Sequence, residues 1–279
     1  MKSLRLPRNF PLSGCMTEIS PGDTMYVTSE HYVSVGLSAL KIFEWAITEG
    51  FTRSEGLRTI LDLPCGHGRV ARILRARFPG AELTACDIDH AGVDFCVDRL
   101  GAKGVYSTAD FDKLDLGGLY DLIWVGSLIT HLNPSDTVKF LRCMERSLSE
   151  DGVLIISNHG KLVADRIAAE NPSSPVVILY NIVGYGCDAD SYIKRYGGSI
   201  ISRHWLEGFF AGEPCGIIAY LDHEWDNNHD VLFVKKRPLL PIEFDAKTYL
   251  MINQDVADTG IDPERHYLMF GHKEGRRYR

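Results

Sequence analysis

The stretch Ile60-Leu61-Asp62-Leu63-Pro64-Cys65-Gly66-His67-Gly68-Arg69-Val70 decides the fold predicted for this chain. The apolar run up to Leu63 suits a strand buried in a parallel sheet. A pair of glycines then interrupts the run, and Val70, Ile73 and Leu74 recur at helical spacing after them. The stretch therefore predicts a strand, a tight turn and a helix.

Such a unit is suited to binding a nucleotide-type cofactor. Gly66 and Gly68 let the backbone approach a ligand closely, and the free N–H groups at the helix start attract polar or anionic groups. An acidic residue is expected about 20 residues further on, at the end of the next strand, where it would bind a ribose. Asp87, which follows the predicted strand 82–86, occupies that place.

Two kinds of cofactor fit these glycines. Gly66, Gly68 and Ala71 also satisfy the G-x-G-x-x-G/A pattern of nicotinamide enzymes, so an NAD(P)-dependent oxidoreductase is one reading. Asp62 favours a cofactor with a methionyl moiety, because an acid just before the glycines would repel a pyrophosphate and attract an amino group.

With Asp62 in that place, the sequence resembles the class I S-adenosylmethionine-dependent methyltransferases, whose first motif runs acid-x-Gly-x-Gly-x-Gly. Pro64 stands where the first glycine of that motif is usual. The resemblance implies an α/β fold: a Rossmann-like, seven-stranded, mostly parallel sheet with helices on both faces and an antiparallel last strand. It also implies S-adenosyl-L-methionine as cofactor, held by Asp62, Pro64, Cys65, Gly66, Gly68, Asp87, Ile88, Asp110, Phe111, Gly126 and Ser127.

Two further motifs extend the resemblance. After a predicted strand at 104–106, Asp110 and Phe111 occupy the places of an acid that binds the adenine amino group and a residue that packs on its ring. Asp110 as an ordinary turn former is the alternative. Later, Asp121-Leu122-Ile123 matches the family's fourth strand, and its exit at Gly126-Ser127 would face the methylsulfonium.

Two histidines follow strands that end at the same edge of the predicted sheet. His131 lies five residues past Gly126, and His159 directly follows the predicted strand 153–157. A histidine is a natural general base near pH 7, so we expect His159 to take the acceptor's proton and His131 to support it. Helix packing for His131 and a surface loop position for His159 are the alternatives.

Four residues are candidates for contacting the acceptor. Tyr32 lies on an apolar helix predicted from Ser29 to near Gly50, which in this family covers the cofactor. Tyr180 and Tyr185 lie in an irregular insertion at 161–200, and His223 in a loop at 222–230 that joins two final strands. For the tyrosines, ordinary packing is the alternative. The loop's histidines and acids show no metal-ligand spacing, so no metal is expected.

Composition narrows the functional classes. The chain has 279 residues, 45% of them hydrophobic, a formal net charge of -7 and a pI near 5.8. These values disfavour nucleic acid as a partner, because such binders carry a basic face. Seven cysteines without a C-x-x-C pair disfavour a disulfide framework, and no apolar run approaches the ~18 residues of a membrane span. A cytoplasmic location is expected.

The chain is predicted to have three parts: an N-terminal arm and lid helix at 1–56, a methyltransferase core at 57–237, and a linker with a small helical module at 238–279. The tail resembles a short module, Y-L-x-x-N-P-D-V-A followed by H-Y-x-x-x-G-x-x-E-G-R, of bacterial glycosyltransferase and polysaccharide-associated proteins, with Gln254 replacing the proline. This resemblance suggests that the acceptor is a sugar hydroxyl of a glycan or glycolipid, or another small molecule. It also suggests a protein partner or self-association through the tail. A non-catalytic cofactor-binding scaffold remains the other alternative.

Overall fold

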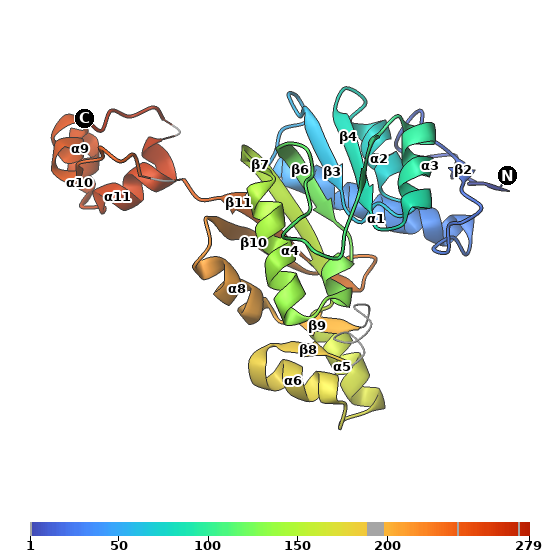
Figure 1. The fold of residues 1–279 in the computed structure, drawn as a ribbon. Helices are drawn as coiled ribbons and strands as arrows, with labels where there is room; N and C mark the ends of the chain where they lie inside the picture. The colour runs from blue at the N-terminus through green and yellow to red at the C-terminus, as the bar shows by residue number, and fades with distance from the viewer. Residues whose placement is uncertain (1, 189–197, 239, 273) are drawn as a thin grey trace. The chain divides into compact units, whose positions relative to one another are not determined.

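A seven-stranded sheet forms the centre of the fold (Figure 1). The computed structural model describes residues 2–188, 198–238, 240–272 and 274–279. The strand order is β10-β11-β7-β6-β3-β4-β5, and β11 runs antiparallel to both of its neighbours. The pairs from β7 to β5 are parallel, which confirms the predicted fold class. The strands are β3 Thr59–Asp62, β4 Glu82–Asp87, β5 Lys103–Tyr106, β6 Tyr120–Val125, β7 Leu148–Asn158, β10 Cys215–Trp225 and β11 His229–Lys236.

Helices cover both faces of the sheet because its strands are apolar on both sides. Along β3, Ile60 packs into one buried cluster and Leu61 into another. The first cluster contains side chains of α1 Ser29–Thr48, α2 Ala71–Arg77 and α3 His90–Leu100. The second contains side chains of α4 Pro134–Arg146 and α8 Arg203–Ala211.

Local capping fixes where the helices begin. The Thr28 side chain accepts a hydrogen bond from the His31 N–H, so α1 begins where the sequence predicted. Asp89 and Ser202 cap α3 and α8 in the same way. Asn133 caps α4, and Pro134 takes the first helical position.

The segment between β7 and β10 is more regular than the sequence indicated. It contains α5 Lys161–Glu170, α6 Pro175–Val183, and the antiparallel strands β8 Tyr185–Cys187 and β9 Ser199–Ile201. The prediction of a loop at 222–230 is wrong over most of that range. Trp225 pairs with His229, so both strands continue through it and only a short turn remains between them.

The N-terminal arm is tied to the core through one buried arginine. It forms a small antiparallel sheet of β1 Lys2–Ser3 and β2 Glu18–Ile19. Arg72, only 1% exposed, donates hydrogen bonds to the carbonyls of Met16 and Glu18 and to the Tyr32 hydroxyl. The arm, α1 and α2 therefore share one hydrogen-bonded centre.

The chain divides into two compact units, Met1–Lys236 and Arg237–Arg279. The second contains α9 Ala246–Ile252, α10 Gln254–Thr259, α11 Pro263–His266 and a π-helical turn at Tyr267–Gly271. Tyr249, Val256 and Tyr267 form its buried centre, and the Tyr249 hydroxyl lies 2.9 Å from His266 Nδ1. This unit thus has a small core of its own.

Candidate active site

The carboxyl ends of β3, β4, β6 and β7 meet at one edge of the sheet, because these strands are parallel. Asp62, Asp87, Ser127 and His159 come from these four strand ends. In open α/β sheets, ligands bind at this edge where the strand order reverses. Here the reversal lies between β3 and β6.

The turn after β3 leaves one glycine facing open space. Gly66 and Gly68 both have positive φ, at 47° and 78°, which favours glycine at each position. A Cβ on Gly66 would meet no atom within 4 Å, whereas one on Gly68 would lie 3.0 Å from Leu100 Cδ1. Gly66 therefore borders the ligand side of the turn and Gly68 packs against α3.

Asp62 is a buried carboxylate with little hydrogen bonding of its own. It is 1% exposed, and neither of its oxygens accepts a hydrogen bond of good geometry within the described chain, although the Ala71 N–H lies close enough to lower its pKa slightly. Burial, followed by the charge of Asp87, raises the pKa of the Asp62 carboxyl well above its usual range. A ligand ammonium beside it would supply the missing donor, so the site fits a methionyl amino group.

Asp87 organises the turn as well as the strand end. Its Oδ2 accepts a hydrogen bond of 2.7 Å from the Gly66 N–H, and its Oδ1 accepts one of 2.9 Å from the Asp89 N–H. Each oxygen keeps further acceptor capacity for a ribose hydroxyl. Asp89 caps α3, and its carboxylate lies 3.1 Å from His67 Nε2. Ile88 between them is 64% exposed.

The two residues expected at the adenine end differ in their environment. Asp110 is partly exposed and lies 2.8 Å from Lys113 Nζ, and this hydrogen bond lowers the pKa of its carboxyl. Phe111 is buried, with its ring 5.1 Å from the Phe140 ring. Phe111 thus belongs to the core under α4, and its role toward an adenine stays a prediction.

Ser127 lies at the exit of β6, beside two histidines. It adopts a left-handed conformation with φ 67°, and its N–H donates to Ser157 Oγ at 2.8 Å. Its own Oγ lies 3.3 Å from His229 Nε2. The His229 ring stacks on the His159 ring, with 4.5 Å between their centres. Residues from β6, β7 and β11 therefore converge here.

These histidines are neutral at pH 7. Burial, then the charge of His131, lowers the pKa of His159 to about 4. Burial, then the charge of His159, lowers the pKa of His229 to about 3. The charge of His131 also contributes to the lowered pKa of His229. The chemical roles of His131 and His159 stay predictions.

A second polar cluster lies next along β11. Asp230 is 2% exposed and accepts a hydrogen bond of 2.7 Å from the Tyr220 hydroxyl. His223 Nδ1 lies 3.1 Å from Asp230 Oδ1, and its side chain is 40% exposed. Burial, followed by the charge of Asp230, raises the pKa of the half-buried Tyr180. Tyr180 and His223, both predicted acceptor contacts, therefore border one cluster.

Two of the predicted acceptor contacts are packing residues in this structure. Tyr32 is 1% exposed, and its hydroxyl donates to Asp23 Oδ2 at 2.6 Å. Tyr185 is 3% exposed, and its hydroxyl lies 2.8 Å from the Leu132 carbonyl. Their rings have almost no surface left for an acceptor, so the structure does not support that assignment.

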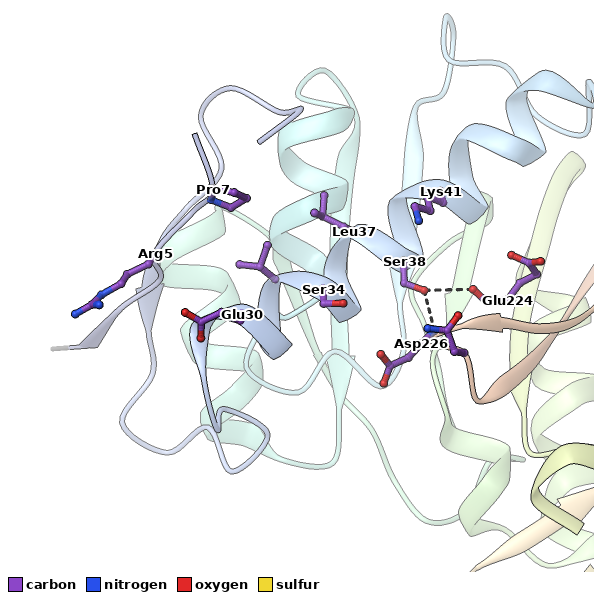
Figure 2. A pocket seen from close by; sticks show the side chains of 11 residues that line it. Arg5, Pro7, Glu30, Ser34, Leu37, Ser38, Lys41, Glu224 and Asp226 are labelled. Atoms are coloured by element: carbon purple, nitrogen blue, oxygen red, sulfur yellow. Dashed lines mark hydrogen bonds between the residues drawn. The ribbon is translucent and has the colours of Figure 1, made fainter. Parts of the chain in front are cut away.

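A groove of about 570 Å³ lies along α1, bordered by the N-terminal arm and the β10–β11 turn. Figure 2 shows Arg5 and Glu30 toward one end and Lys41, Glu224 and Asp226 toward the other. Ser38 joins α1 to the turn by two hydrogen bonds. Its Oγ donates to the Glu224 carbonyl at 3.2 Å and accepts from the Asp226 N–H at 2.8 Å. The groove is lined by neither Asp62 nor the glycines.

Sequence reasoning missed three residues that shape the site. A Cβ on Gly92 would lie 2.4 Å from the Gly66 carbonyl oxygen, so α3 can approach the turn only with glycine there. His229 had been considered only as a residue of the loop. Arg69 directly follows Gly68 and is visible in the motif itself. In the part of the chain that the structure describes, no three His, Cys, Asp or Glu side chains converge to hold a metal ion.

Comparison with known proteins agrees with this geometry. Residues 60–152 match the family described as "Methyltransferase domain". The malonyl-[acyl-carrier protein] O-methyltransferase of Acetivibrio thermocellus is 31% identical over 104 residues, which is 37% of this chain and 36% of that protein. Residues 60–152 therefore form a methyltransferase domain. Because the match spans about a third of the relative's length, the relative's activity does not transfer directly.

Solved methyltransferase structures share the fold. DesVI of Streptomyces venezuelae has a TM-score of 0.54 at 11% identity, covering 78% of this chain and 99% of DesVI. CalS10 of Micromonospora echinaspora, described as an amino pentose methyltransferase with bound S-adenosylmethionine, has a TM-score of 0.51 at 14% identity. That match covers 76% of this chain and 98% of CalS10. At such identities the likeness concerns the methyltransferase fold alone. Among the described helices, none has the length and apolarity to cross a bilayer.

Proposed function

We propose that this protein is an S-adenosylmethionine-dependent methyltransferase that methylates a sugar hydroxyl of a glycan or glycolipid, or another small molecule. The observation that carries the proposal is the buried Asp62 carboxylate beside the glycine turn, whose oxygens accept no hydrogen bond of good geometry within the described chain. An ammonium would satisfy it, whereas the pyrophosphate of a nicotinamide cofactor would be repelled. The methyltransferase domain match supports the same cofactor.

The cofactor assignments follow from the strand ends. Asp62 would bind the ammonium of S-adenosylmethionine, Asp87 the ribose hydroxyls and Asp110 the adenine amino group. The backbone from Pro64 to Gly68 would lie against the cofactor, with Gly66 on the open side. When bound, S-adenosylmethionine supplies an electrophilic methyl group, and the exit at Gly126-Ser127 would border it.

The histidine pair suits the acceptor's chemistry. Methyl transfer to a hydroxyl group would require a base of this chain to accept the hydroxyl proton. His159 is neutral at pH 7 and can accept that proton. The acceptor ring would then extend toward Tyr180 and His223, which border the Asp230 cluster.

Three observations favour a sugar acceptor. The carboxylate, phenol and imidazole groups around Asp230 can both donate and accept hydrogen bonds, as hydroxyl groups require. The net charge of -7 disfavours nucleic acid. The resemblance of the tail to polysaccharide-associated modules points the same way, and it motivates a protein partner or self-association through Arg237–Arg279.

The test measures transfer of tritium from [methyl-³H]S-adenosylmethionine to a panel of methyl glycosides, the matching amino sugars and malonyl coenzyme A. Labelled methyl glycosides are the expected product. Label on amino sugars or the malonyl thioester alone would replace the acceptor class while keeping the methyltransferase. No transfer to any panel member, together with no binding of S-adenosylhomocysteine, would refute the proposed function.

A further inference from the structure

Helix α6 presents an apolar surface to solvent. It contains one polar residue, Asn181, and residues 171–187 around it carry no charged side chain. In Figure 1 the helix lies at the outer margin of the larger unit, beyond β8 and β9. Four of its large aliphatic side chains are 41% to 72% exposed: Ile178, Leu179, Ile182 and Val183. Contiguous exposed apolar patches are uncommon and mark places where proteins bind ligands, partners or membranes.

These four side chains form one continuous strip, the α6 face. Ile178 and Ile182 are four positions apart, so they are neighbours on the helix. Leu179 and Val183 form a second such pair beside them. Tyr180, three positions before Val183, is half-buried and lies at the border between the α6 face and the side of the helix that packs on the protein.

The packed side of α6 connects this face to the candidate active site. Val177 and Tyr180 pack with Ile200 of β9 in one small cluster. The next residue of β9, Ile201, donates its N–H to the His159 carbonyl at 2.8 Å. The α6 face therefore belongs to the same packed segment as the histidine assigned to the acceptor.

The polar cluster around Asp230 adjoins the same segment. A Cβ on Gly160, the residue before α5, would overlap the Asp230 carboxylate, so Asp230 lies directly against the backbone that leads from β7 to α5. The proposed function extends the acceptor's sugar from this cluster toward Tyr180, at the border of the α6 face. A substituent on that sugar would meet apolar surface as it leaves the polar cluster.

The size and composition of the α6 face select among its conceivable occupants. Its four side chains expose roughly 400 Å², whereas each partner of a stable protein dimer buries ~800 Å². An anionic membrane surface attracts Lys and Arg, and residues 171–187 contain neither. A single hydrocarbon chain needs only a narrow apolar strip, and the nine residues of α6 provide one ~13 Å long.

We propose that the acceptor is a lipid-linked sugar whose hydrocarbon chain lies along the α6 face while its sugar lies at Asp230. The inference rests on the proposed function, because it requires a sugar beside His159. It narrows the acceptor class from sugars in general to glycolipids. A free sugar would fill only the polar part of the site and would leave the α6 face in water.

The experiment compares methyl and n-octyl glycosides of the same sugars as acceptors of tritium from [methyl-³H]S-adenosylmethionine, below the concentration at which the octyl compounds form micelles. The wild-type protein is expected to use n-octyl glycosides with a kcat/KM about 10- to 100-fold higher, mainly through KM, because buried methylene groups strengthen binding. Ile182→Gln is expected to remove this preference and to keep the rate on methyl glycosides. Ile242→Gln removes the same side chain from an exposed position before α9 and should keep the full preference.

The outcomes separate this inference from the proposed function. Equal kcat/KM for methyl and n-octyl glycosides, or an undiminished preference in Ile182→Gln, would overturn the assignment of the α6 face. In that case, sedimentation with and without phosphatidylcholine vesicles shows whether Ile182→Gln disrupts a dimer or vesicle binding instead. If a thermal melt shows that Ile182→Gln is misfolded, Leu179→Gln gives the same comparison. Transfer to neither kind of glycoside would refute the sugar acceptor of the proposed function itself.

Discussion

Replacing Asp62 with asparagine should stabilise the ligand-free protein while weakening its binding of cofactor. The folded state raises the pKa of this carboxyl well above 3.8 because it is buried. Below pH 3.8 the folded and unfolded states both hold the proton, so the group does not affect stability. As the pH rises, the unfolded state loses its proton first and becomes favoured, until the pH passes the folded-state pKa.

The size of this effect follows from proton linkage. Over that pH range, each unit of pH costs the folded wild-type protein up to about 1.4 kcal/mol from this one group. Asp62→Asn cannot lose a proton, so its advantage over the wild type should widen from pH 5 upward. Thermal melts of both proteins between pH 5 and 8 measure the difference.

Binding of S-adenosylhomocysteine should show the opposite preference. Its ammonium pairs with ionised Asp62, so binding should release a proton from the wild-type protein, and more of it at lower pH. Titrations in phosphate and in Tris, whose ionisation enthalpies differ, report that release. In Asp62→Asn the release should vanish and affinity should fall by about 1.5 to 3 kcal/mol.

Asp98→Asn is the matched control, since Asp98 lies exposed on α3. It should change neither the pH dependence of stability nor the proton release. The reasoning about Asp62 fails if Asp62→Asn binds S-adenosylhomocysteine as tightly as the wild type and wild-type binding heats are the same in both buffers.

Three further predictions concern other parts of the chain. Asp87→Ala should weaken S-adenosylhomocysteine binding by ~1.5 to 3 kcal/mol in calorimetry and also lower the melting temperature, because Asp87 accepts the Gly66 N–H; unchanged affinity would remove its ribose assignment. His159→Ala should lower kcat by ~10² to 10⁴ with cofactor affinity unchanged. The rate of the wild-type enzyme should fall only toward pH 4, where His159 becomes protonated. A fall in that rate centred near pH 6.5 would contradict His159 as the base. Truncation after Arg237 should leave cofactor affinity and cooperative melting unchanged, and a non-cooperative melt would show that the tail belongs to the core.

The fold could be predicted because its signals are local. Thr28, Asp89 and Ser202 each cap the helix that follows them, and threonine, aspartate and serine are among the residues that favour a helix start. The glycine turn and the acid at position 87 have a fixed spacing that a nucleotide site requires. These elements needed no knowledge of distant contacts.

The parts that could not be predicted depend on contacts between distant segments. Tyr185 was predicted to contact the acceptor, with packing as the alternative, and its hydroxyl in fact reaches the Leu132 carbonyl, 53 positions away. The strands around His223 and His229 continue through a polar segment because the pairing of Trp225 with His229 outweighs its loop-like composition. The polar composition of residues 222–230 therefore predicted a loop, whereas the pairing of β10 with β11 determines the structure there.

The same distinction holds within the site. Asp62 and Asp87 could be assigned from spacing, whereas the lowered pKa of His159 arises from burial and from the charge of His131, which only the folded chain brings near. The sequence alone does not distinguish the environment of Arg69 from that of Arg72. Arg72 donates to four backbone carbonyls, whereas the Arg69 side chain makes no hydrogen bond within the described chain and lies with its guanidinium carbon 5.9 Å from the centre of the Tyr32 ring.

The central claim is that the edge formed by β3 and β4 binds S-adenosylmethionine. Calorimetric titration of the full chain with S-adenosylhomocysteine, and separately with NADH, tests it most directly. The account predicts saturable binding of one S-adenosylhomocysteine per chain and no binding of NADH. Binding of NADH without S-adenosylhomocysteine would restore the oxidoreductase reading, and binding of neither would contradict the account.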